Sequence, residues 1–249
     1  MTRGSIVDFG NGLQSFPNYY TIGPNVQWFH RHGVTGLFEE GPGANFGVGS
    51  DLEELKDWVA AEMMWDPSLD PDELISEFLV GYYGSASPFI RRSMDIMHAA
   101  VNQTQFFLRI TVVADAWQSY LTPMALLSSA QAFADASQAP VSAVVQVRVA
   151  RAAQGNLYTA LWRWEELRRF DAANVSMAWP LPSTQAEAFR RFASVFNSTG
   201  TQLLTAMAPK PKGAEALRWL HGCVFAPYAS DCGAARPPSF ISRSTANQL

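Results

Sequence analysis

Three pairs of a helix-capping residue followed by proline constrain the fold of most of this chain. The pairs are Asp70-Pro71, Ser87-Pro88 and Thr122-Pro123. Asp, Ser and Thr accept hydrogen bonds from the free N–H groups of a first helical turn, and proline is tolerated there because that position needs no N–H donor. Strand signals disappear from Asp66 onward, so the sequence predicts a helical array over the C-terminal two thirds.

Apolar residues at helical spacing give the approximate extent of each helix. The segment 105–120 fits either a helix or a strand. Aromatic residues make up 12% of the chain and include eight Trp, and most of these rings fall at helical spacing, which favours a packed helical core over a sugar-stacking surface. Helices are expected over residues 71–80, 88–101, 123–136, 141–170, 184–197 and 213–221.

The first 65 residues show a different pattern, in which short helix and strand signals alternate. Residues 24–32 predict a short helix between Pro24 and Gly33, and residues 34–39 are β-prone. A capping box at Ser50 precedes another helix, whose apolar stripe comprises Leu52, Leu55, Val59 and Met63. Residues 6–9 could form one more strand in front. This alternation is typical of the βα units of a parallel sheet or barrel.

Composition and charge exclude several classes of partner. The net charge is −4, from 18 Lys+Arg and 22 Asp+Glu, and the chain has no basic stripe, so we expect no nucleic acid partner. It also has no apolar run of about 18 residues, so we expect no membrane span. The first residues lack the apolar core of a signal peptide.

Three glycosylation acceptor patterns begin at Asn102, Asn174 and Asn197, which is more than the roughly one expected by chance and favours a secreted full-length ancestor. The localisation of this chain itself stays open. Cys223 and Cys232 could close a small disulfide loop in an oxidising compartment or remain reduced and buried.

Adjacent acidic residues mark the most interesting position for chemistry. Glu39 and Glu40 end the expected strand 34–39, and βα barrels place their active sites at the carboxyl ends of strands. Neighbouring strand residues face opposite ways, so only one of the two can point into a barrel mouth. A glycosidase needs a second carboxylate roughly 5–9.5 Å away, and Asp8 is the candidate. The alternative is that Glu39 and Glu40 are solvated loop acids.

Other chemistries lack support in the sequence. The chain has no Gly-x-Ser-x-Gly elbow, and Gly41-x-Gly43 lacks the strand-to-helix spacing of a nucleotide loop. His30 and His32 face different sides of a helix with no third ligand at metal spacing. We therefore expect neither a cofactor nor a metal site.

Six short motifs together resemble a known family. The chain reads FPN at 16–18, GPN at 23–25, HGVTGLFEEG at 32–41, DLEELK at 51–56, WDPSLD at 65–70 and FLVGYYG at 78–84. These motifs are similar to the C-terminal part of domain-of-unknown-function family 4838, whose members are classed with glycoside hydrolases of the α-glucuronidase and β-hexosaminidase type. The resemblance is close over about residues 7–100 and loose in the later helices.

The resemblance implies a mostly α fold with an incomplete (β/α) TIM-barrel remnant followed by an all-helical C-terminal domain. The remnant would cover residues 1–65, the helical domain 66–232, and residues 233–249 would form a disordered tail. We expect a fragment of a carbohydrate-processing protein that is inactive alone, because most barrel strands would be missing. A glycan or glycoside would bind once the barrel is completed, and the open barrel edge could favour self-association.

Under the same resemblance, Glu39 matches an acidic position of the family and is the candidate catalytic residue. Glu40, Asp8 and Asn11 are the candidate substrate-binding residues. Gly12 stands where the family usually has Tyr, so this strand end departs from the pattern. The rival interpretation is a non-enzymatic helical interaction module formed by residues 66–230.

Overall fold

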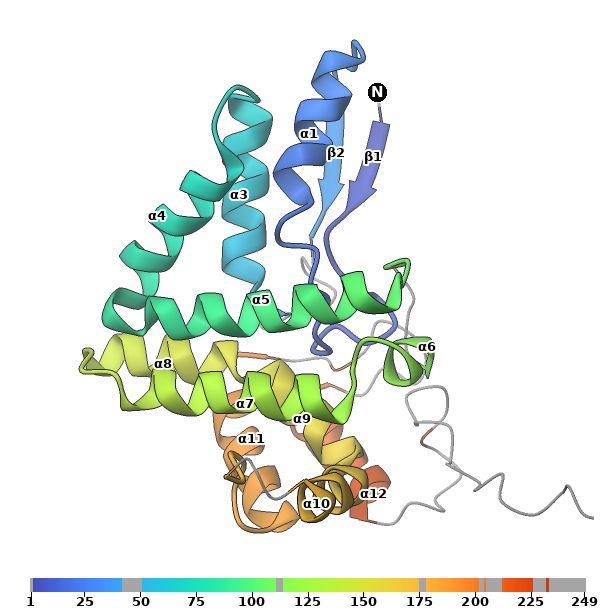
Figure 1. Cartoon of the computed structure of the whole chain (residues 1–249), viewed down its shortest axis with the longest axis vertical. Helices are drawn as coiled ribbons and strands as arrows, with labels where there is room; N and C mark the ends of the chain where they lie inside the picture. Colours follow the sequence, from blue (N-terminus) through green and yellow to red (C-terminus); the bar gives the residue numbers. More distant parts are fainter. Residues whose placement is uncertain are drawn as a thin grey trace, which may run out of the picture.

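A small parallel sheet stands on a layer of long helices in this protein (Figure 1). The arrangement comes from a computed structural model, and every structural statement refers to the residues that it describes. These are residues 2–41, 51–110, 114–174, 178–201, 204, 212–225 and 232. The predicted tail 233–249 and the predicted cap Ser50 lie outside them.

The N-terminal part is a β-α-β-α arrangement. Strand β1 (Thr2–Ser5) is followed by helix α1 (Ile22–Arg31), strand β2 (Leu37–Glu40) and helix α3 (Glu53–Trp65). The two strands pair in parallel, with Thr2 opposite Leu37 and Ser5 opposite Glu40. Helix α1 packs on α3, and the apolar stripe predicted for α3 is buried. The alternation expected from the sequence is thus present, with two short strands.

Both predicted strands are displaced along the chain. The strand expected at residues 6–9 is wrong, because the parallel ladder ends with the bond from Ile6 N to Glu40 O at 3.1 Å. The chain then turns, and the Asp8 carboxylate accepts a hydrogen bond from Gly10 N at 2.8 Å, which is a local turn geometry that competes with a strand. The strand expected at 34–39 lies at 37–40, since Gly33 has a φ of 77° and extends the turn after α1.

The remaining described elements are helical, and no strand occurs among the described residues after Asp66, as predicted. Asp70 caps α4 through Asp72 N and Glu73 N, and Thr122 caps α7 through Ala125 N. The third pair marks a helix start, but Ser87 is itself the first helical residue. The helices are α4 (Pro71–Tyr83), the short 3-10 helix η1 (Gly84–Ala86), α5 (Ser87–Thr104), α6 (Ala114–Gln118), α7 (Pro123–Gln138), α8 (Ala143–Ala152), α9 (Gln154–Trp162), α10 (Trp164–Ala173), α11 (Gln185–Ser198) and α12 (Gly213–Phe225).

The single long helix expected over 141–170 is wrong, because the segment is divided into α8, α9 and α10. The first break is at Ala153, next to the point where Gly155 meets the loop that follows β1. The second is at Arg163, whose guanidinium donates to the Leu121 carbonyl and pairs with Glu166. Apolar periodicity continues through both breaks, so it could not reveal them.

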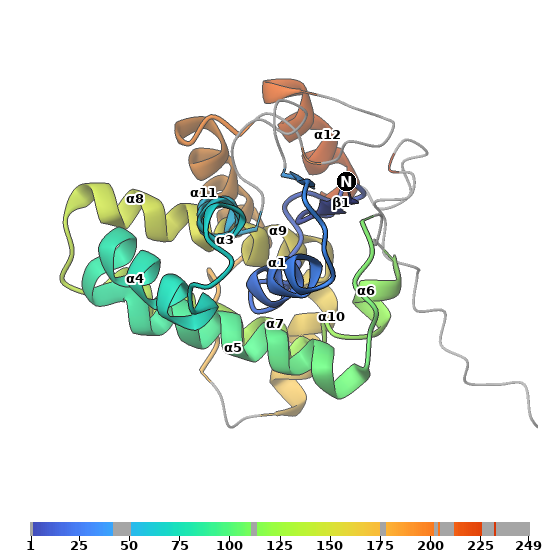
Figure 2. The same ribbon diagram turned by 90° about the horizontal axis from the view of Figure 1, so that it is seen from above.

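The hydrophobic core does not divide at residue 65. One buried cluster joins Val26 of α1 and Val59 of α3 to Ile90 of α5, Phe133 of α7 and Val149 of α8. Viewed from above, α1 and β1 stand over the layer that contains α5, α7 and α9 (Figure 2). Within the described residues, no helix has the length and apolar character needed to cross a bilayer.

Candidate functional site

The loop that follows β1 carries the main concentration of buried polar side chains near the strands. The carboxyl ends of β1 and β2 point toward the helical layer, so this loop lies between the sheet and α5, α7 and α9 (Figure 1). Every residue from Ile6 to Tyr19 except Phe9 is buried. Five polar residues of the loop are at most 8% exposed, namely Asp8, Asn11, Gln14, Ser15 and Asn18.

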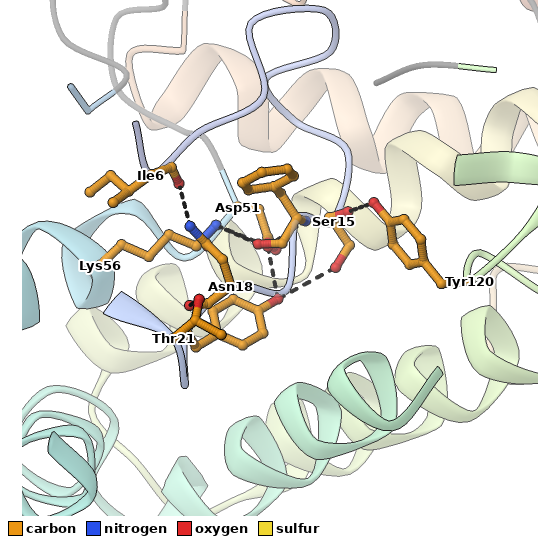
Figure 3. Close-up of polar contacts among 9 residues, drawn as sticks. Ile6, Ser15, Asn18, Thr21, Asp51, Lys56 and Tyr120 are labelled. Carbon is orange, nitrogen blue, oxygen red and sulfur yellow. Dashed lines mark hydrogen bonds and ion pairs between the residues drawn. The ribbon is translucent and has the colours of Figure 1, made fainter. Parts of the chain in front are cut away.

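A buried ion pair anchors the second half of this loop (Figure 3). Asp51 Oδ2 accepts hydrogen bonds from Phe16 N at 2.9 Å and from the Tyr19 hydroxyl at 2.8 Å. Lys56 Nζ lies 3.4 Å from the same oxygen and donates to the Phe16 carbonyl at 2.8 Å. Burial lowers the pKa of the Lys56 ammonium, and the Asp51 charge opposes that shift. Each charged group thus has a partner of opposite sign and further hydrogen bonds, as a buried ion pair requires.

The helical layer holds the loop from the other side. The Tyr120 hydroxyl donates to the Ser15 carbonyl at 2.7 Å, and Trp117 Nε1 donates to Gln14 Oε1. A Cβ atom added to Gly155 of α9 would lie 2.2 Å from the Leu13 carbonyl oxygen. Backbone approach of this kind is open only to glycine, so α9 and the loop are fitted to each other.

Several polar atoms beside this contact are fully buried and lie in one cluster. They are Asn11 Nδ2 and Oδ1, Gln14 Nε2, Tyr158 Oη and Trp162 Nε1. Burial raises the pKa of the Tyr158 hydroxyl, and hydrogen bonding with the Trp162 and Asn11 side chains acts to lower that pKa, so these three groups lie close together. An amide has two donor hydrogens and two acceptor sites, so the Asn11 side chain could also bind a water or a ligand hydroxyl.

Aromatic rings surround these polar atoms. The Trp162 ring centroid lies 6.2 Å from that of Trp117, 6.2 Å from that of Tyr158 and 6.0 Å from that of Trp219. Trp117 precedes α7, Trp162 ends α9 and Trp219 belongs to α12. The loop thus meets an aromatic wall built from three separate parts of the helical region.

Glu39 and Glu40 end the second strand of the sheet on opposite faces. Leu37 packs against the core formed with α1 and α3, and strand alternation puts Glu39 on the same face. The Glu39 carboxylate lies over Gly4, and burial raises the pKa of this half-buried carboxyl. Phe38, 46% exposed, and Glu40 occupy the opposite face. Of the pair, Glu40 faces directly away from the two helices.

Comparison with known proteins now identifies the segment that carries this loop. Residues 6–95 match the family model described as "Domain of unknown function (DUF4838)". Over this segment, about a third of its length, the chain is similar to the DUF4838 family. The resemblance found in the six sequence motifs is thereby confirmed, and it extends from the loop after β1 into α5. No curated protein and no solved structure matches the chain.

The DUF4838 segment holds only one side of the candidate site. Asp8, Asn11, Gln14, Glu39 and Glu40 lie within residues 6–95. The side chains that face the loop from the helical layer lie outside the matched segment, namely Trp117, Tyr120, Tyr158 and Trp162.

The remaining predicted positions lie apart from this loop. Cys223 and Cys232 form a disulfide, with Cα atoms 5.5 Å apart, so of the two alternatives the structure has the closed loop. The three acceptor residues Asn102, Asn174 and Asn197 are exposed. In the described part of the chain, no group of three His, Cys, Asp or Glu side chains is placed to bind a metal.

Sequence reasoning identified Asp8 and Asn11 but missed their surroundings. Gln14, Lys56 and Asp51 carried no motif that pointed to the loop, and Tyr158 and Trp162 read as ordinary members of an apolar helix face. One signal was present: Gly155 stands inside a predicted helix, where glycine is disfavoured unless another backbone approaches closely.

Proposed function

We propose that this chain is part of a glycoside-hydrolase-like, carbohydrate-processing protein whose substrate site lies at the carboxyl ends of β1 and β2. The carrying observation is the fully buried Asn11 amide, which lies beside the Tyr158 hydroxyl and Trp162 in the loop at the carboxyl end of β1. Sugar hydroxyl groups both donate and accept hydrogen bonds, so one of them would satisfy an amide in a way that an apolar ligand could not.

The topology supports the same proposal. The order β1, α1, β2, α3 with parallel strands is what two consecutive βα units of a barrel would give, and barrel enzymes bind substrates at the carboxyl ends of their strands. Phe38 is half exposed on the face of the sheet that lies opposite α1 and α3. In a closed barrel this face would point into the interior and be covered by side chains of the other strands. In this proposal the two βα units are a barrel remnant.

The acidic residues would divide the chemistry between them. A glycosidase uses one protonated and one ionised carboxyl group, and burial raises the pKa of Glu39 in the direction that suits the acid. Glu39 is therefore the proposed catalytic acid. Its carboxylate lies over Gly4 on the helix-facing side of the sheet, so it would have to turn past the end of β2 to reach a substrate on the other side. Asp8, Asn11 and Glu40 are the proposed substrate-binding residues.

Sugar binding by the 249-residue chain tests the proposal. A panel of monosaccharides and short oligosaccharides is titrated while saturation-transfer NMR and tryptophan fluorescence are recorded, since Trp117 and Trp162 lie beside the loop. Asn11→Leu should abolish sugar binding, because leucine can neither donate nor accept a hydrogen bond at this position.

Asn156→Leu is the matched control. Its amide is also buried, but it donates to the Leu126 carbonyl at 3.0 Å, so its loss should lower stability without affecting sugar binding. Binding of no sugar in the panel by the parent chain, or equal binding by Asn11→Leu, would overturn the proposal.

A further inference from the structure

A narrow cavity lies among the helices of the C-terminal region. Residues of α7, α8, α9 and α11 and of the segment 180–182 line it. Its volume is about 40 Å³. Most of its wall is apolar and is formed by Ala130, Phe133, Ala150, Leu157, Phe192 and Val195.

The size of the cavity limits what can enter. About 10–15 Å³ is enough for one water molecule, whereas an engineered cavity of about 150 Å³ is known to hold benzene. A space of about 40 Å³ therefore suits a short aliphatic chain and excludes an aromatic ring. Transfer of such a chain from water into an apolar cavity is favourable, because it removes apolar surface from water.

Two neighbouring arginines of α11 line the cavity or the open hollow beside it, which Glu187 also lines. Arg191 lines both the cavity and a wider open hollow next to it, whereas Arg190 lines only the hollow. Both side chains are exposed, and neither forms an ion pair with any residue in the described part of the chain. A guanidinium group at the entrance to an apolar cavity favours a ligand that carries a carboxylate.

The wall contains two buried amide side chains. Gln154 is 1% exposed, and its Nε2 has no hydrogen-bond partner among the described residues. Its Oε1 accepts from the Thr201 hydroxyl at 3.4 Å, which fixes the orientation of the amide. Asn156, which also lines the cavity, already donates to the Leu126 carbonyl. Neither amide therefore presents a free donor to the cavity, because Gln154 Nε2 is itself fully buried.

We infer that this cavity is a binding site for a short-chain aliphatic carboxylate. The hydrocarbon chain fills the space between Phe133, Leu157 and Phe192, and the carboxylate meets the Arg191 guanidinium. Hydrogen bonds to charged groups are about twice as strong as neutral ones, so the charge of the ligand decides the affinity. The site is separate from the proposed glycan site and does not depend on it.

Butanoate is the probe, and calorimetric titration of the full chain is the measurement. Butanoate should bind, and three related ligands should each bind at least tenfold more weakly. Acetate lacks the hydrocarbon chain, butylamine lacks the negative charge, and benzoate is too wide for the cavity. Arg191→Gln should weaken butanoate binding tenfold or more. Arg190→Gln is the matched control and should change the affinity less than threefold, since Arg190 does not line the cavity.

Two further variants separate the cavity from its charged rim. Ala150→Leu should abolish binding by filling the space, and Gln154→Leu should change the affinity less than threefold, because its amide nitrogen is buried and does not face the cavity. Both Arg substitutions are at exposed positions and leave the fold intact, so they decide the matter even if Ala150→Leu does not fold. Equal binding of butanoate and butylamine, equal loss with Arg190→Gln and Arg191→Gln, or no butanoate binding would overturn the inference.

Discussion

Replacing Gly155 by alanine tests the contact on which the candidate site depends. The added Cβ would lie 2.2 Å from the Leu13 carbonyl oxygen and 3.4 Å from the Leu13 carbonyl carbon. The obstacle is backbone, so it cannot rotate away like the end of a side chain, and α9 and the loop must separate by about 1 Å to reach ordinary contact. Overpacking of this kind costs about 1–3 kcal/mol, whereas alanine gains about 0.5–1 kcal/mol over glycine in a helix.

The expected net result for Gly155→Ala is a loss of about 1–2 kcal/mol in the free energy of unfolding. For a chain of this size that corresponds to a Tm lower by about 2–8 °C. Urea denaturation followed by far-UV circular dichroism gives the free energy of unfolding. Relative to the parent chain, amide hydrogen exchange should become faster in the loop 6–21 and change less in α4. Sugar binding, where present, should weaken with it, because Asn11 is part of the same loop.

Gly81→Ala is the matched control for this experiment. Gly81 also lies inside a helix, and a Cβ added there meets nothing within 4 Å. It should therefore stabilise the protein by up to about 1 kcal/mol through helix propensity alone. If Gly155→Ala proved as stable as Gly81→Ala, the close approach of α9 to the Leu13 carbonyl would be refuted.

Three further predictions concern charged groups. In a complete protein with a closed barrel, Glu39→Gln should reduce sugar turnover and Glu40→Gln should mainly weaken sugar binding, as kcat and KM will show; the reverse pattern would exchange their roles. Burial and the nearby Glu53 raise the pKa of Asp57 from 3.8 to about 6, so ionising Asp57 opposes folding as the pH rises from about 4 to about 6. Asp57→Asn should therefore be more stable than the parent at pH 7 and show a smaller fall in stability across that range, and a parallel pH profile would contradict this. Lys56→Met should cost about 3–5 kcal/mol by leaving Asp51 buried without its ammonium partner, and adding Asp51→Asn should recover part of that loss in a double-mutant cycle.

Local signals predicted the helical region well. Asp70 and Thr122 cap their helices through their own side chains, and this geometry is specified within three residues of sequence. The displaced strands and the divided long helix depended on distant contacts instead. Arg163 ends α9 while it donates to the Leu121 carbonyl, 42 residues away in sequence, and no local pattern encodes such a partner.

The interior of the loop 6–21 could not be predicted for the same reason. Asn11 and Gln14 are residue types found mostly at surfaces, yet both are buried here. The bond from Tyr120 to the Ser15 carbonyl spans 105 positions of sequence, and that from Trp117 to Gln14 spans 103. The sequence therefore indicated where polar residues follow a strand, but only the packing of the helices on that loop showed which of them are enclosed.

These long-range contacts make the DUF4838 segment and the later helices one energetic unit. The loop is held by Lys56 and Asp51 on one side and by Tyr120 on the other, so neither side fixes it alone. The core cluster also continues from α3 into α7 and α8, across the boundary expected at residue 65. Loss of packing at the far end of α9 should therefore disturb Asn11 as well as the helices. In the proposed function, the helical region would then act as one wall of the substrate site, because it positions the loop that presents Asp8 and Asn11 to the sugar.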